Sequence, residues 1–385
     1  MAEVSREVMG TYYRRLFPFK STFHWLNHEP TPNELFYNRE IAFNLPDDVI
    51  VRYQSFNDVD EFKKQVCKLN PTRFEIGPVY TSRPRDRKTT RKEAFNPETA
   101  RARTSASAAG PSSPPPCVSS TPPSGTSSAG STSCGCTPAV AGSICGSRIK
   151  EAMELTDDQR KAIVNWLTVV PKDESKRVNV RFGSRPLPAS LQPALDHLAM
   201  VFTELILQDQ DCFASEEGAE AFLKLIPDSR VVDSLRTQWE SSSSSSEEKW
   251  KDLKTEIKRW PKESPQRASL MAAMEDIILQ YTYPRLDENV SKKRNHLLKA
   301  PFCIHPKTGR VCVPVDPEKI EEFDPEAVPT VNQLIRELDT TAENAEHHSD
   351  WERTSLKPYV DMLDRHNQRI MEEVRRDKRG GDMSW

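Results

Sequence analysis

Residues 104–147 of this 385-residue chain contain no charged and no aromatic side chain. They consist mostly of Ser, Pro, Ala, Gly and Thr, with four cysteines among them. Such a segment cannot bury enough apolar surface to offset the conformational entropy that is lost on ordering. The sequence therefore predicts that this segment is disordered and that the parts on either side of it fold.

The composition of the whole chain is that of a globular protein, with 36% hydrophobic and 29% charged residues. Its length allows two or three packed units. No apolar run approaches the roughly 20 residues that cross a bilayer, and the N-terminus has no apolar signal core. Eight irregularly spaced cysteines favour a reducing compartment over a disulfide framework. The net charge of −3 does not indicate nucleic-acid binding by the chain as a whole.

Positive charge is nevertheless concentrated between residues 80 and 103, where three acids accompany eight basic residues. The basic residues of this run are Arg83, Arg85, Arg87, Lys88, Arg91, Lys92, Arg101 and Arg103. Such a run usually forms a solvated or disordered face, and only sometimes contacts phosphate.

The N-terminal part predicts a helix over 12–17, followed by a β-hairpin. Large apolar residues recur at every second position over 41–45 and again over 49–53, on either side of a Pro-Asp-Asp turn. The alternation places Glu40 and Arg52 on the face opposite the apolar stripe, close to each other across the two strands. On these features alone, a surface ion pair of little energetic weight is the favoured interpretation.

From residue 148 to about 280 the apolar spacing predicts helices. Thr156 can cap the first of them, whose buried face would include Ile163, Trp166 and Leu167. Further helices are expected over 191–206, after the serine run 241–246, and over about 268–281. These apolar stripes are typical of a core, and they indicate no chemistry.

Charged groups gather again between residues 279 and 315. Asp287 is followed by the basic residues Lys292, Lys293, Arg294, His296, Lys299, His305, Lys307 and Arg310. A carboxylate beside such groups could hold a divalent metal next to a polyphosphate, because phosphoryl transfer needs both charges neutralised. A basic hairpin in solvent explains the local features equally well. Cys303, His305 and Cys312 could also bind zinc, although the paired short spacings of structural zinc sites are missing.

The run from Tyr281 to Pro314 resembles the signature of the small, catalytic subunit of eukaryotic DNA primase. Similar blocks are Tyr12–Phe17, Asn38–Glu40, Val51–Asn57, Glu75–Tyr80, Phe323–Pro325, Val328–Thr330 and Arg336–Asp339. The resemblance covers about 10–103 and 148–340 in the family's order. It implies a mixed α/β core of the archaeo-eukaryotic primase family, formed by 1–103 and 281–340. A mainly helical subdomain, 148–280, is inserted into this core, and 341–385 form a charged tail.

The resemblance also implies an activity and its partners. The family synthesises short RNA primers from ribonucleoside triphosphates on a single-stranded DNA template, with Mg²⁺ or Mn²⁺. It acts in the nucleus with the primase large subunit, within the DNA polymerase alpha complex, and not at a membrane. A catalytically inactive relative that acts only in assembly or nucleotide binding is the alternative, and a related gap-filling polymerase fits the blocks less well.

Roles carry over only to positions that match the family's motifs. Asp287 matches a carboxylate of the metal site, and Glu40 matches an acid placed in the active site. The positions that match basic contacts to the nucleotide are Arg52, His296, Lys299 and His305.

Three elements of the family should lie within 104–147, and none is present. They are an Asp-x-Asp pair that bridges two metals, a cluster of four cysteines that binds structural Zn²⁺, and a Ser-Gly-Arg-Arg-Gly-x-His motif. The cysteines that occur there do not reproduce the zinc spacing; they are Cys117, Cys134, Cys136 and Cys145.

A second reading frame contains one of the missing motifs. When the free third bases are chosen suitably, the codons for Cys136–Gly146 read from the third base encode Tyr-Ser-Gly-Arg-Arg-Gly-Val-His-Leu-Trp. We therefore interpret 104–147 as family sequence read out of frame, with the frame restored near Arg148. An evolved Ser/Pro linker explains the composition but not the hidden motif. The transcript decides: upstream in-frame Asp-x-Asp codons support the interpretation, and a shifted frame in every read refutes a sequence error.

Overall fold

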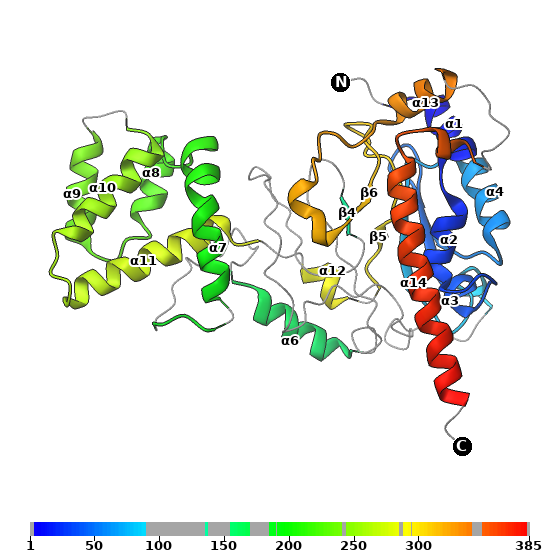
Figure 1. Cartoon of the computed structure of the whole chain (residues 1–385), viewed down its shortest axis with the longest axis horizontal. Coiled ribbons are helices and arrows are strands. Elements are labelled where there is room, and N and C mark those ends of the chain that lie inside the picture. The colour runs from blue at the N-terminus through cyan, green and yellow to red at the C-terminus, as the bar shows by residue number, and fades with distance from the viewer. Residues whose placement is uncertain are drawn as a thin grey trace. The chain divides into compact units, whose positions relative to one another are not determined.

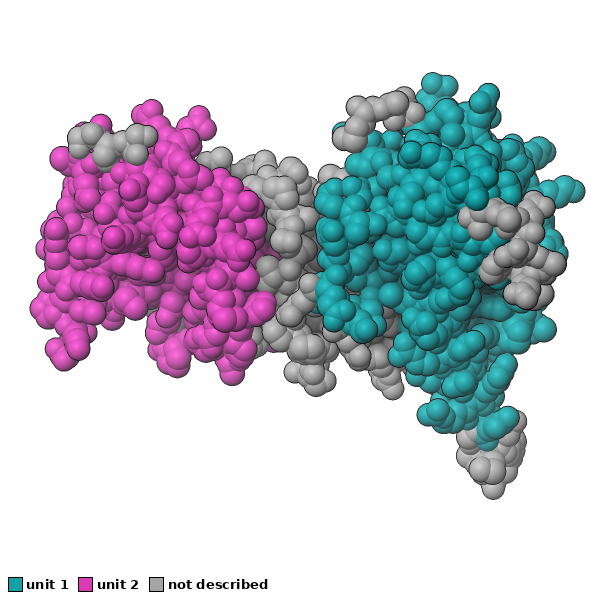
Figure 2. Space-filling model, turned by 45° about the horizontal axis from the view of Figure 1, so that its top comes forward, with its two compact units in different colours: residues 1–113, 126–165, 287–385 teal, residues 114–125, 166–286 magenta. Residues whose placement is uncertain are grey.

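A computed structural model of the chain describes residues 4–89, 135–137, 155–169, 185–189, 191–240, 244–284, 288–293, 295–340 and 349–382. The chain divides into two compact units, coloured separately in Figure 2. Unit 1 comprises residues 1–113, 126–165 and 287–385, and unit 2 comprises residues 114–125 and 166–286. None of the helices in the described ranges is long and apolar enough to cross a membrane.

Unit 1 combines segments from both ends of the chain (Figure 1). Its N-terminal elements are α1 (Arg6–Thr11), the π-helix η1 (Tyr12–Leu16), α2 (Phe19–Asn27), α3 (Glu34–Tyr37), β1 (Arg39–Asn44), β2 (Ile50–Gln54), α4 (Val59–Leu69), β3 (Arg73–Val79) and the 3₁₀ turn η2 (Pro84–Asp86). Its later elements are β4 (Gly135–Thr137), α12 (Glu288–Lys292), β5 (Leu298–Lys299), β6 (Val313–Val315), η5 (Pro317–Glu322), α13 (Val331–Thr340), η6 (Asp350–Arg353) and α14 (Lys357–Asp382).

The main sheet of unit 1 is antiparallel, with the strand order β2-β1-β3-β5. The predicted hairpin is confirmed as β1 and β2. Asp47 and Asp48 both have positive φ between these strands, a conformation that tight hairpin turns require and that Asp tolerates. In this register Phe43 lies opposite Val51 on one side and Phe74 on the other.

One face of this sheet is packed against the N-terminal helices. Phe43 and Phe74 are fully buried there, in one cluster with Tyr12 and Tyr13 of η1. The Tyr12 hydroxyl donates a hydrogen bond of 2.8 Å to the Phe302 carbonyl oxygen, far along the chain. The helix predicted over 12–17 is thus present as the π-helix that follows α1.

The C-terminal segment, which the sequence describes only as a charged tail, contributes to the core of unit 1. In Figure 1, α14 runs alongside α2. Leu356, Val360 and Leu363, at helical spacing, are buried in the core of unit 1. The Asn367 side chain donates a hydrogen bond of 2.8 Å to the Ser21 carbonyl. Many charges on the other face of α14 obscure this narrow apolar stripe, so composition alone misses it.

Three residues of the segment 104–147 are among those described. Gly135–Thr137 form β4, which pairs with β6 in a separate two-stranded antiparallel sheet. These residues therefore differ from the disorder that the composition predicts. Pairing through backbone groups needs no particular side chain, and the remainder of the segment lies outside the described residues.

Unit 2 is helical, as predicted. Its elements are α7 (Gln192–Phe202), the π-helix η4 (Thr203–Asp209), α8 (Glu216–Leu223), α9 (Ser229–Glu240), α10 (Ser246–Lys258) and α11 (Pro265–Thr282). The serine run leads into α10, where Ser245 and Glu248 form a capping box. Trp250 and Leu253 are buried in the core of this unit.

Helix α6 (Asp157–Leu167) begins as expected but buries a different face. The Thr156 hydroxyl accepts a hydrogen bond of 3.2 Å from the Gln159 amide and so caps the helix. Val164 is buried, whereas Trp166 is 59% exposed. The predicted burial of Trp166 is therefore wrong, because the helix buries the face that carries Val164 instead.

Candidate functional site

The face of the main sheet that does not join the aromatic core carries charged side chains. Ala42 of β1 lies opposite Glu75 of β3, which in turn lies opposite Lys299 of β5. Side chains alternate between the two faces of a strand. Glu40 therefore shares this face with Ala42, and Arg73 shares it with Glu75. We call this the polar face of the sheet.

Both strands next to β1 contain a bulge at this face. Between the pairs Ile41–Gln54 and Phe43–Val51, β2 contains one residue more than β1. Between the pairs at Arg39 and Ile41, β3 likewise contains one residue more than β1. Bulges redirect side chains and are frequent beside functional sites. Here they flank Glu40 on both sides.

Glu40 is fully buried, and both oxygens of its carboxylate accept hydrogen bonds. Arg52 binds it through two hydrogen bonds, Nε to Oε1 at 2.9 Å and Nη2 to Oε2 at 3.3 Å. The Tyr53 amide donates to Oε1 at 3.1 Å, and the Tyr80 hydroxyl donates to Oε2 at 2.9 Å. The pair of Glu40 and Arg52 is confirmed, but the interpretation as a surface ion pair is wrong, because the carboxylate is inaccessible to solvent.

The acid–base properties of the neighbours reflect this carboxylate. Burial alone would lower the pKa of Arg52, but the hydrogen bonds to Glu40 and its negative charge outweigh burial and raise it. Burial raises the pKa of Tyr80, and the charge of Glu40 raises it further. Arg52 is therefore held as a cation and Tyr80 as a neutral donor.

The space beside Glu40 depends on Gly77. A Cβ atom at Gly77 would lie 2.9 Å from Glu40 Cβ and 3.0 Å from Leu297 Cδ2. We expect Gly77→Ala to lower the free energy of unfolding by about 1–3 kcal/mol, because both contacts are shorter than van der Waals distance. Denaturant unfolding measures this.

Gly10→Ala is the comparison for Gly77→Ala. At Gly10 the added Cβ would be nearest, at 3.1 Å, to the far end of the flexible Arg14 side chain. Equal losses in the two variants would contradict the close packing of Gly77 against Glu40.

The basic part of the site is formed by β5 and the loop that follows it. The His305 amide donates to the Arg310 carbonyl at 2.8 Å, and the Gly309 amide donates to the His305 carbonyl at 2.8 Å. Gly309 has a positive φ of 68°, which glycine adopts without strain. The resulting tight turn presents His305, and the His305 Nδ1 atom lies 3.0 Å from the Thr308 hydroxyl oxygen. This contact leaves Nε2 as the ring nitrogen for a ligand.

Several cations act on His305. Burial lowers the pKa of His305, and the charges of Lys299, Lys307 and Arg73 lower it further. The three cationic side chains thus come from β3, β5 and the turn, and each is close enough to act on His305. A concentration of positive charge beside a half-buried imidazole is suited to binding a polyanion. We call these four residues the cation cluster.

The structure brings most of the predicted site residues into unit 1 together. Glu40 and Arg52 form one pair, and Lys299 and His305 form part of the cation cluster. His296 is partly buried in a turn just before β5, where its amide donates to the Lys293 carbonyl. Lys299 lies three residues further on, in β5. Asp287 lies outside the described residues.

The site also contains residues to which sequence reasoning gave no role. Glu75 and Arg73 lie on the polar face and are joined by a hydrogen bond of 3.3 Å, while Tyr80 binds Glu40. For Arg73 and Glu75 the sequence signal was the alternation of polar and apolar residues over 73–77, in which Phe74 and Ile76 are buried. The register of β3 is needed to show which residues of the neighbouring strands lie beside these two side chains.

The described residues do not by themselves provide a metal site. No group of three or more His, Cys, Asp or Glu side chains among them is placed to hold a metal ion. The Glu40 carboxylate already accepts hydrogen bonds on both oxygens, and Glu75 is paired with Arg73. A hard divalent cation needs several free oxygen ligands, so we derive no step through a metal from these residues.

The zinc alternative for Cys303, His305 and Cys312 is not supported either. The Cys303 thiol is buried in the core, where it donates a hydrogen bond of 3.5 Å to the Phe74 carbonyl. Burial raises the pKa of this thiol to about 12, and in the described parts of the chain these three residues form no group that is placed to hold a metal ion.

The fold and the polar face define a protein with an α/β unit that carries basic groups and a buried acid–arginine pair on one sheet. Comparisons with known proteins identify its family. The family model for the DNA primase small subunit matches residues 142–317. The DNA primase small subunit of Schizosaccharomyces pombe is 39% identical over 90% of this chain and 80% of its own length. The corresponding protein of Saccharomyces cerevisiae is 34% identical over 92% and 89%, and that of Drosophila melanogaster is 29% identical over 87% and 82%.

The chain therefore belongs to the DNA primase small subunit family. The match to S. pombe, over nine tenths of the chain, confirms the resemblance found from the motif blocks.

Proposed function

We propose that this chain is the primer-synthesising subunit of a DNA primase, a DNA-directed RNA polymerase. It would join ribonucleoside triphosphates on a single-stranded DNA template in the nucleus, with the primase large subunit and the DNA polymerase alpha complex. Mg²⁺ or Mn²⁺ would supply the charge neutralisation that attack on the alpha-phosphate needs. Asp287 is the metal-site carboxylate that the family's motif assigns within this chain.

The observation that carries the proposal is the cation cluster on the same sheet as the pair Glu40–Arg52. Neighbouring strands lie about 4.8 Å apart, so β5 lies two strand spacings from β1. That separation is within the length of a bound nucleoside triphosphate. Lys299 and His305 would bind the triphosphate, with His296 at its edge and Arg52 near the reacting end. These residues position the nucleotide and offset the charge that develops on the leaving pyrophosphate.

Binding of a nucleoside triphosphate tests this arrangement. We expect Lys299→Ala and His305→Ala each to weaken binding about tenfold, because each removes a hydrogen bond to the charged triphosphate worth about 1.5 kcal/mol. A fluorescent ribonucleotide titrated into a chain with the reading frame of 104–147 corrected gives the dissociation constant. Lys262→Ala, an exposed lysine of unit 2, is the control. Equal affinities in all variants would refute the triphosphate site.

The pH dependence of binding provides a second test. The lowered pKa of His305 leaves its imidazole neutral at pH 7, and a bound polyanion favours the protonated form. We therefore expect nucleotide affinity to rise as the pH falls below about 6.5, the unperturbed value. The same titration between pH 5.5 and 8 measures this. In His305→Gln the increase in affinity at low pH should be smaller. If this variant has the same pH profile as the unaltered chain, His305 is not the group that causes the increase.

The alternative, an inactive relative that only binds nucleotide or assembles with partners, predicts the same binding results but no primer synthesis. None of the comparisons favours it. Primer synthesis by a frame-corrected chain together with the large subunit separates the two.

A further inference from the structure

The first part of the basic run 80–103 is fixed on unit 1 rather than free in solvent. After Tyr80, which binds Glu40, the chain forms the turn η2 and places each of its arginines against a partner. The partners come from β2, from the loop after it and from α3 and α4. The run therefore lies immediately beside the candidate site.

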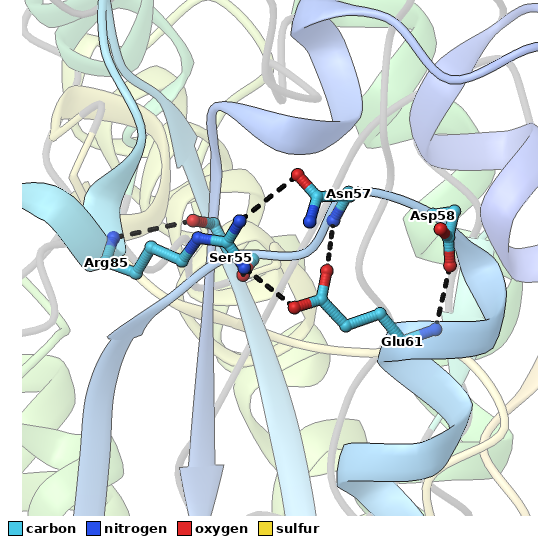
Figure 3. Close-up of polar contacts among 5 residues, drawn as sticks. All are labelled: Ser55, Asn57, Asp58, Glu61 and Arg85. Atoms are coloured by element: carbon cyan, nitrogen blue, oxygen red, sulfur yellow. Dashed lines mark hydrogen bonds and ion pairs between the residues drawn. The ribbon is translucent and has the colours of Figure 1, made fainter.

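Arg85 anchors this segment (Figure 3). Its guanidinium donates to Glu61 Oε1 at 2.7 Å and to Asn57 Oδ1 at 3.1 Å, and its amide donates to Ser55 Oγ at 3.4 Å. Glu61 is held in turn by the amide of Asn57 at 2.6 Å. The network joins η2 to the start of α4, and it neutralises the carboxylate that would otherwise repel an anion at this place.

Arg87 then stacks on an aromatic ring next to the site. Its guanidinium carbon lies 3.7 Å from the ring centroid of Tyr53, and that of Arg52 lies 4.9 Å from the same ring. Tyr53 belongs to the bulge in β2 and has a positive φ of 60°, which is uncommon for a bulky residue. Its amide is the one that binds Glu40. The backbone of Tyr53 is thus held in this uncommon conformation by the same carboxylate that binds Arg52.

A second pair of this kind lies close by in the chain. The Arg83 guanidinium carbon lies 5.1 Å from the ring centroid of Tyr37, the last residue of α3, three residues before Glu40. Arg87 and Lys88 are exposed. Among the described residues β2 is an edge strand of the sheet, and none of the described strands pairs with its outer side.

We propose that Tyr53, Arg87, Arg83 and Lys88 form a binding surface for a single strand of nucleic acid beside the active site. The inference rests on the proposed function and adds the place where the strand runs. Planar guanidinium groups on aromatic rings accept stacked bases, and neighbouring cations bind the phosphates. Neither interaction reads base identity, which suits a surface that must accept any template.

The test measures binding of a fluorescent oligo-dT of about 20 nucleotides, a length that exceeds the site of one such surface. Anisotropy is recorded with the full chain, without nucleotide and in the presence of a chelator. These conditions make the result independent of catalysis and of the triphosphate site. Failure here would therefore not be confused with failure of the proposed function.

Two substitutions separate the contribution of phosphate binding from that of base stacking. We expect Arg87→Ala to weaken binding about tenfold and to reduce the salt dependence by about 0.7 in log–log slope, the effect of one phosphate contact. Tyr53→Asn should weaken binding about fivefold without changing that slope, because it removes only the ring. Asn tolerates positive φ, so this variant keeps the backbone conformation.

Matched controls exclude a purely structural effect. Tyr53→Phe keeps the ring and should bind as the unaltered chain does. Arg230→Ala removes an exposed arginine that stacks on Trp260 at 4.7 Å in unit 2, and it should leave binding unchanged. Equal circular dichroism and unfolding midpoints verify that each variant is folded.

The outcomes are distinct. If Arg87→Ala binds like Arg230→Ala, or if Tyr53→Phe loses as much affinity as Tyr53→Asn, the proposal is overturned. A parallel titration with oligo-rU identifies the strand. If Arg87→Ala and Tyr53→Asn lose affinity for oligo-dT, the surface binds the template. If they lose affinity for oligo-rU alone, the surface binds the RNA product and the assignment to the template is overturned.

Discussion

Replacing Glu40 by alanine is expected to lower the free energy of unfolding by about 3 kcal/mol. The carboxylate is fully buried and accepts four hydrogen bonds, from Arg52, Tyr53 and Tyr80. Its removal leaves these donors without their acceptor, and loss of one partner of a buried ion pair costs about 3–5 kcal/mol. We take the lower end because the Arg52 side chain is 38% exposed and solvent screens its charge.

The chain contains a matched control for this variant. In unit 2, Glu220 accepts the same two-pronged interaction from Arg236, with distances of 2.9 and 3.1 Å, but both side chains are exposed. Exposed pairs contribute less than about 1 kcal/mol. We therefore expect Glu220→Ala to have a small effect in the same denaturant titration. A loss for Glu40→Ala no larger than that for Glu220→Ala would show that burial of the carboxylate does not matter.

The chain as written is expected to make primers at least about a thousandfold more slowly than a frame-corrected chain. The written sequence lacks the Asp-x-Asp pair of the family, and the described residues offer no alternative set of metal ligands. Metal stabilisation of the transition state is worth several kcal/mol, and about 4 kcal/mol corresponds to a thousandfold change in rate. The assay measures primer synthesis on poly-dT with the primase large subunit.

A further variant tests whether the slow primer synthesis results from the missing aspartates. In the frame-corrected chain, changing both aspartates of the restored pair to asparagine should reproduce the low rate while the unfolding midpoint stays close to that of the corrected chain. Efficient primer synthesis by the chain as written would refute the prediction. It would show that the metal ligands come from elsewhere in the chain.

Local patterns predicted most individual elements of the fold. The hairpin of β1 and β2 follows from the period of two around a Pro-Asp-Asp turn, and α10 follows from the apolar spacing after the serine run. The errors arose where a long-range contact decides burial. Trp166 is exposed although it is large, and Leu363 is buried although charged residues surround it in the sequence. Neither outcome can be derived from the helix alone.

The candidate site was predictable in its residue types more than in its geometry. The pairing of Glu40 with Arg52 follows from strand periodicity, and the basic residues near His305 form a visible cluster in the sequence. The roles of Tyr80 and Glu75 depend on bulges and on the strand order, which bring residues from distant segments to one face. Such features have no local signature, so sequence reasoning could not place them.

The joining of the two chain ends in unit 1 has a consequence for biosynthesis. The contacts of Tyr12 with Phe302 and of Ser21 with Asn367 span 290 and 346 positions. Contacts between such distant positions carry a large loop-closure cost and slow the folding of a domain. During translation the first helices must therefore wait, with aromatic side chains uncovered, until the segment around Asn367 has left the ribosome. Recruitment of a chaperone to the nascent N-terminal segment would be the expected cellular response.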